Sequence, residues 1–152
     1  MSSKSIIIMS IVAVVVVYLF TRSSRKMKYP VKGTITSKFG LRTSPTPGAS
    51  TGHNGIDIAV PVGTPVEAPL DGTVQKIYSN SAGGNQMIVK HTNGYTTGYA
   101  HLSAFKKAIG DKVKQGDTIA LTGNTGITTG PHLHFTVRHP KNNLIDPLSV
   151  LS

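Results

Sequence analysis

Cysteine is absent from this chain of 152 residues. Its absence excludes disulfide bonds, thiolate zinc sites and cysteine nucleophiles. Because a protein without thiols tolerates either redox environment, the missing cysteine leaves the compartment open. A zinc site in this chain has to be built from histidine and carboxylate ligands.

Acidic residues are scarce: 6 Asp and Glu stand against 16 Lys and Arg, which gives a net charge of +10. Such a balance favours nucleic acid, anionic lipid or an anionic polymer such as cell wall as a partner. Half of the basic residues lie in the first 42 positions: Lys4, Arg22, Arg25, Lys26, Lys28, Lys32, Lys38 and Arg42. We interpret them as interfacial charge beside a membrane segment. No basic–aromatic interleaving or known binding motif follows, so no nucleic-acid partner is expected.

Long apolar stretches are also rare, and the longest is the 15-residue run Ile6–Phe20, which is broken only by Ser10. A helix of this length spans roughly 22 Å, which is short of the hydrocarbon core of about 30 Å. Adding Ser5 and Thr21 and letting the flanking basic side chains snorkel makes the run long enough to cross. The run therefore predicts one N-terminal transmembrane helix.

This helix divides the chain into three parts. We expect a single-pass anchor over residues 1–21, in contact with lipid through residues 6–20, then a short basic linker over 22–29 and a folded domain over 30–152. The alternative is a cleaved signal peptide. Such a peptide needs small residues at its cleavage site, and residues 21–25, Thr-Arg-Ser-Ser-Arg, fit that requirement poorly.

The folded domain shows short apolar stretches of period two, separated by Gly, Pro and Asn, which indicates an all-β fold. We expect a mainly antiparallel sheet with groove-forming loops. The predicted strands are Gly33–Phe39, Ile56–Ala59, Pro65–Ala68, Gly72–Tyr78, Gln86–His91, Tyr95–His101, Thr118–Thr122 and His132–Arg138. Asn93-Gly94 predicts a tight hairpin turn between two of them. Only Ser103–Ile109 has a briefly helical pattern.

Histidine placement points to a metal site. His53 and Asp57 form an H-x-x-x-D pair, and His132 and His134 form an H-x-H pair on a predicted strand. Residues i and i+2 of a strand point to one face, so both imidazoles can face one site. Imidazole and carboxylate together suit zinc, and three protein ligands leave a fourth position for water. An isolated His101 accompanies the two pairs.

Two histidines and two glycine-rich segments carry no such signal. His91 and His139 have no neighbouring ligand types in the sequence, so we expect both at the surface. Gly83-Gly84 and Gly123–Gly130 either shape an open groove or form plain hairpin loops.

The residues around these pairs resemble the lysostaphin-type, or LytM-like, zinc metalloendopeptidases, which are peptidoglycan hydrolases. The resemblance covers about residues 30 to 148. The matching stretches, in order, are residues 35–42, 53–66, 71–74, 94–95, 99–103, 113–117, 123–126 and 129–135. These motifs in this order are highly specific.

The resemblance implies a role for each matching residue. His53, Asp57 and His134 match the zinc ligands, and His101 and His132 match catalytic histidines. It implies Zn²⁺ as the cofactor, bacterial peptidoglycan as the substrate, and hydrolysis of peptide cross-links by a metal-activated water. The alternative is a catalytically silent wall-binding or activator module of the same fold, against which the intact set of five residues argues.

The charges beside the anchor bear on its orientation. Four basic residues, Arg22, Arg25, Lys26 and Lys28, follow the apolar run, whereas Lys4 alone precedes it. The positive-inside rule then places the domain on the cytoplasmic side, away from the cell wall. Two settings resolve this conflict. One is a bacterial envelope protein whose orientation other factors override. The other is a phage lysin in the internal membrane of a virion, with viral capsid or envelope proteins as partners.

Overall fold

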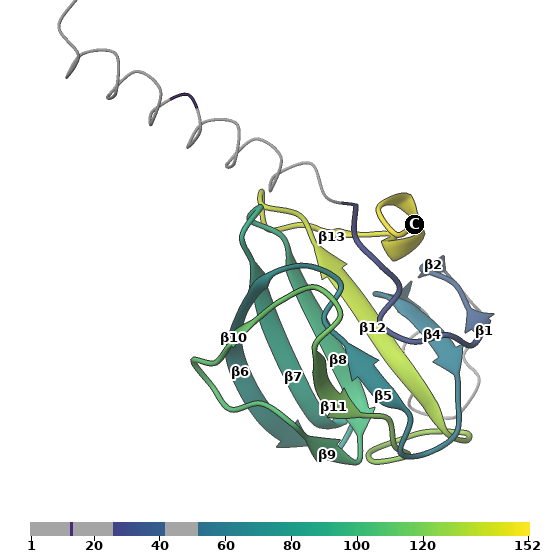
Figure 1. Cartoon of the computed structure of the whole chain (residues 1–152). Coiled ribbons are helices and arrows are strands. Elements are labelled where there is room, and N and C mark those ends of the chain that lie inside the picture. Colours follow the sequence, from purple (N-terminus) through teal and green to yellow (C-terminus); the bar gives the residue numbers. More distant parts are fainter. Residues whose placement is uncertain (1–12, 14–25, 42–51) are drawn as a thin grey trace, which may run out of the picture.

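The computed structural model describes residue 13 and residues 26–41 and 52–152, and these described residues form an antiparallel β fold (Figure 1). The all-β prediction is confirmed, and each of the eight predicted strands is present with its ends within two residues of those expected. The strands are β1 Thr34–Ser37, β2 Gly40–Leu41, β3 Gly52–His53, β4 Ile56–Ala59, β5 Pro65–Glu67, β6 Gly72–Asn80, β7 Gly84–His91, β8 Thr96–Leu102, β9 Ala104–Phe105, β10 Lys112–Val113, β11 Thr118–Leu121, β12 His132–Arg138 and β13 Leu144–Ile145. A short 3₁₀ helix, η1, spans Pro147–Ser149.

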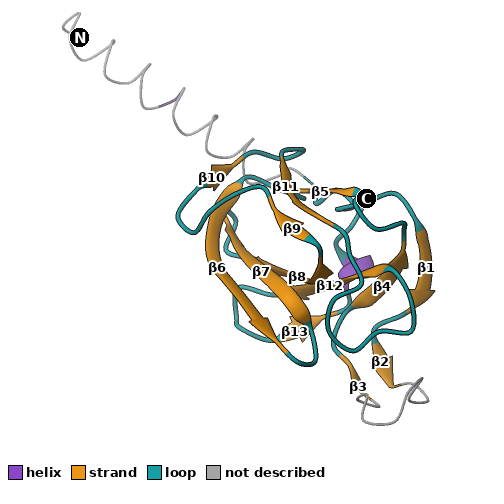
Figure 2. Cartoon of the chain, turned by 90° about the horizontal axis from the view of Figure 1, so that it is seen from below, coloured by secondary structure: helices purple, strands orange, loops and turns teal. Residues whose placement is uncertain are grey.

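The strands form one large sheet and two small ones. The large sheet has the order β1-β4-β12-β8-β7-β6-β10, and β13 pairs with the far end of β12. The small sheets are β5-β11-β9 and β2-β3. Seen from below in Figure 2, β6, β7 and β8 curve around β9 and β11. In the large sheet β12 lies between β4 and β8, and its register places His134 opposite Asp57 on one side and Ala100 on the other.

The large sheet has one buried face and one open face. Along β12 the buried residues Leu133, Phe135 and Val137 alternate with the half-buried His132, His134, Thr136 and Arg138. The buried set belongs to a core that also takes in the small three-stranded sheet through Val66, Ile119 and Ala120. Because a strand alternates its side chains with period two, burying one set directs the histidine pair to the opposite face.

His91 lies on the buried face, so the expectation that it is a surface residue is wrong. Its side chain is 3% exposed, and its Nε2 lies 2.8 Å from Thr97 Oγ1, which in turn lies 2.7 Å from the Tyr99 hydroxyl. Burial lowers the pKa of His91 to about 4. His139, also expected at the surface, is half-buried and packs edge-on against Tyr95 with ring centroids 5.2 Å apart.

The Asn93-Gly94 hairpin is confirmed. It joins the antiparallel strands β7 and β8, and Gly94 has a φ of +89°. Its N–H donates to the carbonyl of His91 at 3.0 Å, which closes the turn. Asparagine and glycine suit this connection because the turn needs backbone torsions that other residues rarely adopt.

The predicted helical segment Ser103–Ile109 is wrong, because this stretch extends the small sheet. Ala104 and Phe105 form β9 and pair with β11. The N–H groups of Ser103 and Lys106 donate to the carbonyls of Leu121 and Ile119. Pairing with β11 therefore takes the backbone hydrogen bonds that a short helix would have used, which shows tertiary context overriding a weak local preference.

Residues 26–29, which were predicted to belong to the basic linker, pack onto the folded domain. Met27 is 3% exposed within the core and forms a parallel bridge with Leu151. The N–H of Lys28 donates to the carbonyl of Pro69. The predicted transmembrane helix over residues 6–20 lies, apart from Ala13, outside the described residues. Within the part of the chain that the structure describes, no helix is long and apolar enough to cross a membrane.

Candidate metal centre

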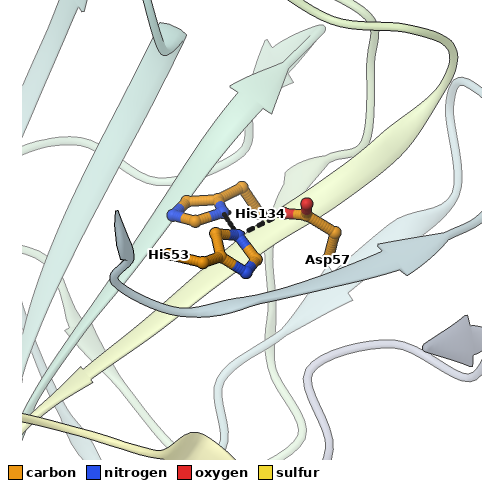
Figure 3. A group of neighbouring side chains, drawn as sticks. All are labelled: His53, Asp57 and His134. Carbon is orange, nitrogen blue, oxygen red and sulfur yellow. Dashed lines mark hydrogen bonds and ion pairs between the residues drawn. The ribbon is translucent and has the colours of Figure 1, made fainter. Parts of the chain in front are cut away.

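Three strands bring the predicted ligands together. His53 comes from β3, Asp57 from β4 and His134 from β12, and Figure 3 shows their side chains converging. Asp57 Oδ1 lies 2.7 Å from His134 Nδ1 and 3.1 Å from His53 Nε2, and these two nitrogens are 3.1 Å apart. His53 and Asp57 are buried, whereas the His134 side chain is 17% exposed. The site is therefore closed on the His53 side and open beside His134.

The outer nitrogen of each ligand histidine faces a fixed hydrogen-bond acceptor. His53 Nδ1 lies 2.7 Å from the carbonyl oxygen of Lys38, and His134 Nε2 lies 2.9 Å from Asn54 Oδ1. An imidazole that donates its outer N–H in this way keeps its lone pair on the inner nitrogen. We therefore assign the tautomers with the lone pairs of His53 Nε2 and His134 Nδ1 directed into the site.

The donor set fits zinc. In these tautomers the lone pairs of His53 Nε2 and His134 Nδ1 and an oxygen of Asp57 converge with no hydrogen atom between them. These three electron-rich atoms repel one another unless a cation lies among them. The separations are slightly shorter than the roughly 3.3 Å expected between ligands of a tetrahedral zinc ion with bonds of about 2.0 Å. Burial raises the pKa of Asp57, but where a proton stands between these atoms in place of the cation, the hydrogen bonds and charges of His134 and His53 outweigh burial and hold the pKa well below its usual range. Asp57 is therefore ionised, as a ligand must be.

His101 and His132 lie beside this centre. Their ring centroids are 4.6 Å apart, and His132 Nε2 is 3.7 Å from Asp57 Oδ1. His101 Nδ1 faces the carbonyl of Thr125 at 2.7 Å, and His132 Nδ1 faces that of Gly130 at 2.8 Å. As for the ligands, donation to a carbonyl leaves the Nε2 lone pair of each ring available. The structure thus brings all five predicted site residues together.

A β-bulge turns His101 toward the site. Along β8, Thr97 and Tyr99 face the core, and regular alternation would send His101 there too. The pairing with β7 shifts between Met87 and Asn85, so that β8 carries one residue more than its partner. His101 itself has a φ of +62°. A bulge with a left-handed residue re-aims a side chain, and here it brings the ring beside His132.

Two glycine-bearing loops hold His101 in place. The carbonyl of Gly83 accepts the His101 N–H at 2.8 Å, and the Thr125 carbonyl faces its ring. A Cβ at Gly84 would lie 2.3 Å from Thr125 Oγ1, so only glycine lets the two loops approach so closely. The glycines near residues 83 and 125 therefore position a site residue, a role beyond that of plain hairpin loops.

Burial also sets the charge of His101. Desolvation lowers its pKa and outweighs the hydrogen bond to Thr125 that raises it, while His132 adds to the lowering. The imidazole is therefore neutral at neutral pH and able to accept a proton at Nε2.

The sequence does not reveal the residues that orient the histidines, namely Lys38, Asn54, Thr125 and Gly130, the last of which also acts through its carbonyl. Lys38 and Thr125 act through backbone carbonyls, which any residue type supplies, so their side chains carry no signal. Asn54 acts through its side chain and follows His53 directly. An amide beside a metal-binding histidine is a signal that sequence inspection can use.

A shallow hollow of about 200 Å³ extends from His134 across the open face of the large sheet. It is lined by Asn54, Tyr78, Gln86, Ile88, Thr96, Gly98, Thr136, Arg138 and Leu144, among others. Strands β6, β7, β8, β12 and β13 supply its floor and walls, and Asn54 is the one lining residue outside a strand, so the groove-forming loops expected from the sequence do not form this hollow.

A β-sheet domain with two histidines and one aspartate around an open position has the ligand set of a catalytic zinc site. The model of Peptidase family M23 matches residues 51–147, and the chain belongs to that family. The prediction of the lysostaphin-type family is thereby confirmed.

Named relatives agree with this assignment. The chain is 43% identical over 111 residues to the peptidoglycan DD-endopeptidase ShyA of Vibrio cholerae, covering 71% of this chain and 26% of that protein. A zinc-containing peptidase from Vibrio cholerae aligns with a TM-score of 0.72 at 39% identity, covering 80% of this chain and 39% of that one. The catalytic domain of the antimicrobial peptidase lysostaphin from Staphylococcus simulans aligns with a TM-score of 0.69 at 29% identity, covering 77% and 90%. These relatives and the ligand set confirm the Zn²⁺ prediction.

The similarity concerns one domain of larger proteins. The chain spans only 26% of the length of curated relatives such as ShyA and an uncharacterized metalloprotease of Haemophilus influenzae. In contrast, it spans nearly the whole lysostaphin catalytic domain.

Proposed function

We propose that this chain is a membrane-anchored zinc endopeptidase that hydrolyses peptide cross-links of bacterial peptidoglycan. The observation that carries the proposal is the arrangement of five residues: three ligands converge, and two more histidines present free Nε2 lone pairs beside them. A purely structural metal site is closed by four protein ligands, whereas this one offers three and opens onto a groove.

His53, Asp57 and His134 hold the ion. When bound, zinc supplies Lewis acidity, which lowers the pKa of water and polarises a carbonyl. His101, neutral because it is buried, accepts a proton at Nε2 and returns it to the leaving amine. In its protonated form His132, whose Nε2 faces Asp57, stabilises the negative charge that develops on the carbonyl oxygen of the substrate. The carbonyls of Thr125 and Gly130 keep both rings in orientation.

Peptidoglycan is the substrate named for relatives that share this domain. ShyA is described as a peptidoglycan DD-endopeptidase, and the family match covers every proposed site residue. The open, shallow groove suits an extended polymer better than a small molecule, because deep apolar pockets are what small ligands usually occupy.

Zymography on purified bacterial walls tests the activity. We expect a zone of digestion that a chelator abolishes and added zinc restores, and mass spectrometry of the fragments identifies the bond cleaved. His101→Ala is the matched control, since it should keep the metal and lose the digestion. Binding of the wild-type chain to walls without any cleavage would instead identify a silent wall-binding module.

The anchor part of the proposal rests on the apolar run Ile6–Phe20 and the basic residues that follow it. Residues 26–29 already contact the folded domain, so only a few residues separate the end of the run from the domain. A chain extends by at most about 3.6 Å per residue, so the domain lies within about 20 Å of any membrane that the run crosses. The excess of basic residues after the run favours a cytoplasmic location of the folded domain, and this location fits a lysin carried in the internal membrane of a phage virion.

Protease protection decides between the two settings. In cells expressing the full chain, we expect the domain to resist external protease in intact spheroplasts and to be digested after lysis. Digestion in intact spheroplasts would show that the domain faces outward, as an envelope enzyme does. A chain recovered in the soluble fraction at high salt would contradict the anchor itself.

A further inference from the structure

The open face of the large sheet is organised in rungs of facing residues, and each rung crosses three neighbouring strands in the order β4-β12-β8-β7. Each rung consists of residues that face one another in the strand register. From the metal centre outward, the rungs are Asp57, His134 and Ala100 (the metal rung), Thr136, Gly98 and Ile88 (the middle rung), and Arg138, Thr96 and Lys90 (the basic rung). Successive rungs are two residues apart, so the basic rung lies about 13 Å from the metal rung at about 3.3 Å per residue.

The middle rung is uncharged. A Cβ at Gly98 would lie only 2.5 Å from Thr136 Oγ1, so glycine leaves room for the Thr136 side chain on the floor of the hollow. The hollow accordingly runs without a break from His134 past Gly98 and Thr136 to Arg138. An extended peptide lying along this floor spans both ends at once.

The far end of the hollow is positively charged. Among the described residues that line it, Arg138 carries the one permanent charge. Arg138 Nη1 donates to the carbonyl of Asn142 at 2.7 Å, which fixes the guanidinium, and its other N–H donors have no hydrogen-bond partner in the part of the chain that the structure describes. Lys90, exposed on the same rung, donates to the carbonyl of Gly94 at 2.8 Å. Among the described residues, neither cation has a carboxylate partner.

We propose that Arg138 is an anion subsite that binds a free carboxylate of the wall peptide, about four residues from the bond that is cleaved. A guanidinium held by one carbonyl presents a planar fork that matches a carboxylate in two parallel hydrogen bonds. The subsite selects acidic cross-linked peptides over their amidated counterparts. This inference rests on the proposed hydrolase function and names a substrate feature that the same groove recognises.

The test compares two substrates on the full chain. Purified cross-linked wall peptides are used in two forms that differ only in whether their side carboxylates are free or amidated. We expect Arg138→Gln to raise KM for the free form about tenfold with little change in kcat, because a hydrogen bond to a charged group that is made equally in ground and transition states affects binding alone. KM for the amidated form should stay unchanged. Lys106→Gln, the same charge change on an exposed loop after β9, serves as the matched control.

Two further measurements keep the inference open to refutation. Arg138→Lys keeps the charge without the fork and should fall between wild type and Arg138→Gln on the free form. In the wild type, added salt should raise KM for the free form more than for the amidated one, since screening weakens an exposed charge pair. Equal losses on both substrates, or equal salt dependence, would overturn the subsite. A wild-type chain that cleaves neither form would contradict the proposed hydrolase, whereas one that cleaves both with one KM would contradict only the subsite.

Discussion

The two faces of the large sheet both carry histidine, and they use it differently. On the buried face, His91 has a partner at each nitrogen: its Nδ1 lies 3.3 Å from the Asp71 carbonyl and its Nε2 2.8 Å from Thr97 Oγ1. On the open face, His134 and the adjoining His53 of β3 each use one nitrogen on an oxygen acceptor and direct the other into the metal site. A histidine satisfied at both nitrogens supports the fold, whereas one with a converging lone pair holds a cation.

Removal of an open-face ligand should have the largest effect. His134→Ala is expected to lower zinc from about one ion per chain to a small fraction and to abolish wall digestion, because two ligands hold zinc poorly. Metal analysis of the purified chain measures this directly. His139→Ala is the control, since its ring packs on Tyr95 away from the site, and it should keep full zinc. Retention of wild-type zinc by His134→Ala would remove His134 from the ligand set.

The two histidines beside the ligands should separate chemistry from metal binding. We expect His101→Ala and His132→Ala to retain zinc and fold while cleavage falls about 10²-fold or more, the usual range for losing a proton-transfer or charge-stabilising group. Rates on purified wall fragments, with zinc content measured on the same samples, provide the check. Near-normal turnover in either variant contradicts the role assigned to that residue.

A smaller effect is expected from the residue that orients His134. Asn54→Ala removes the acceptor at His134 Nε2 and should weaken zinc affinity about 10- to 100-fold, as loss of an outer partner generally does. Competition with a chelator of known affinity measures the change. Asn54→Asp keeps an acceptor and should retain most of the affinity. If Asn54→Ala bound zinc as tightly as the wild type, the outer hydrogen bond would not set the tautomer.

The buried-face histidine should affect stability with pH. Because the pKa of His91 falls from 6.5 to about 4 on folding, its neutral form contributes stability that is fully present above pH 6.5 and is lost as the pH falls toward 4. The change amounts to roughly 3 kcal/mol at 1.36 kcal/mol per pKa unit. Urea unfolding of wild type and His91→Gln at several pH values measures it. We expect the stability advantage of the wild type to shrink as the solution is acidified, and a constant difference would show that His91 does not titrate between the two states.

Much of the site was predictable because its residues lie at spacings that regular strands preserve. The H-x-H pair needs only the alternation of β12, and that alternation is visible in the sequence as apolar residues between the histidines. The register that sets Asp57 opposite His134 is not visible there, since it depends on which strands pair. The family motifs supplied that information instead.

The route of His101 into the site and the strand within Ser103–Ile109 both have a non-local cause. His101 reaches the site only through a bulge against β7 and a positive φ, and regular alternation would have buried it. His91 differs from these, because its cause is local: it faces the core in alternation with Met87 and Val89, against the usual surface preference of histidine. Ser103–Ile109 became part of a sheet because β11 was available to pair with it.

The two ends of the folded domain lie side by side. Met27 bridges Leu151, and the Ser152 N–H donates to the Met27 carbonyl at 2.9 Å. Both ends lie near the end of β12 that pairs with β13, whereas the metal ligands lie at the other end of that strand (Figure 1). The domain is therefore suited to circular permutation: a short loop joining residues 152 and 26, with new ends opened at an exposed turn such as 139–143, should leave the ligand geometry undisturbed. By the same reasoning, further polypeptide can be joined to this domain at either end during evolution without covering the groove.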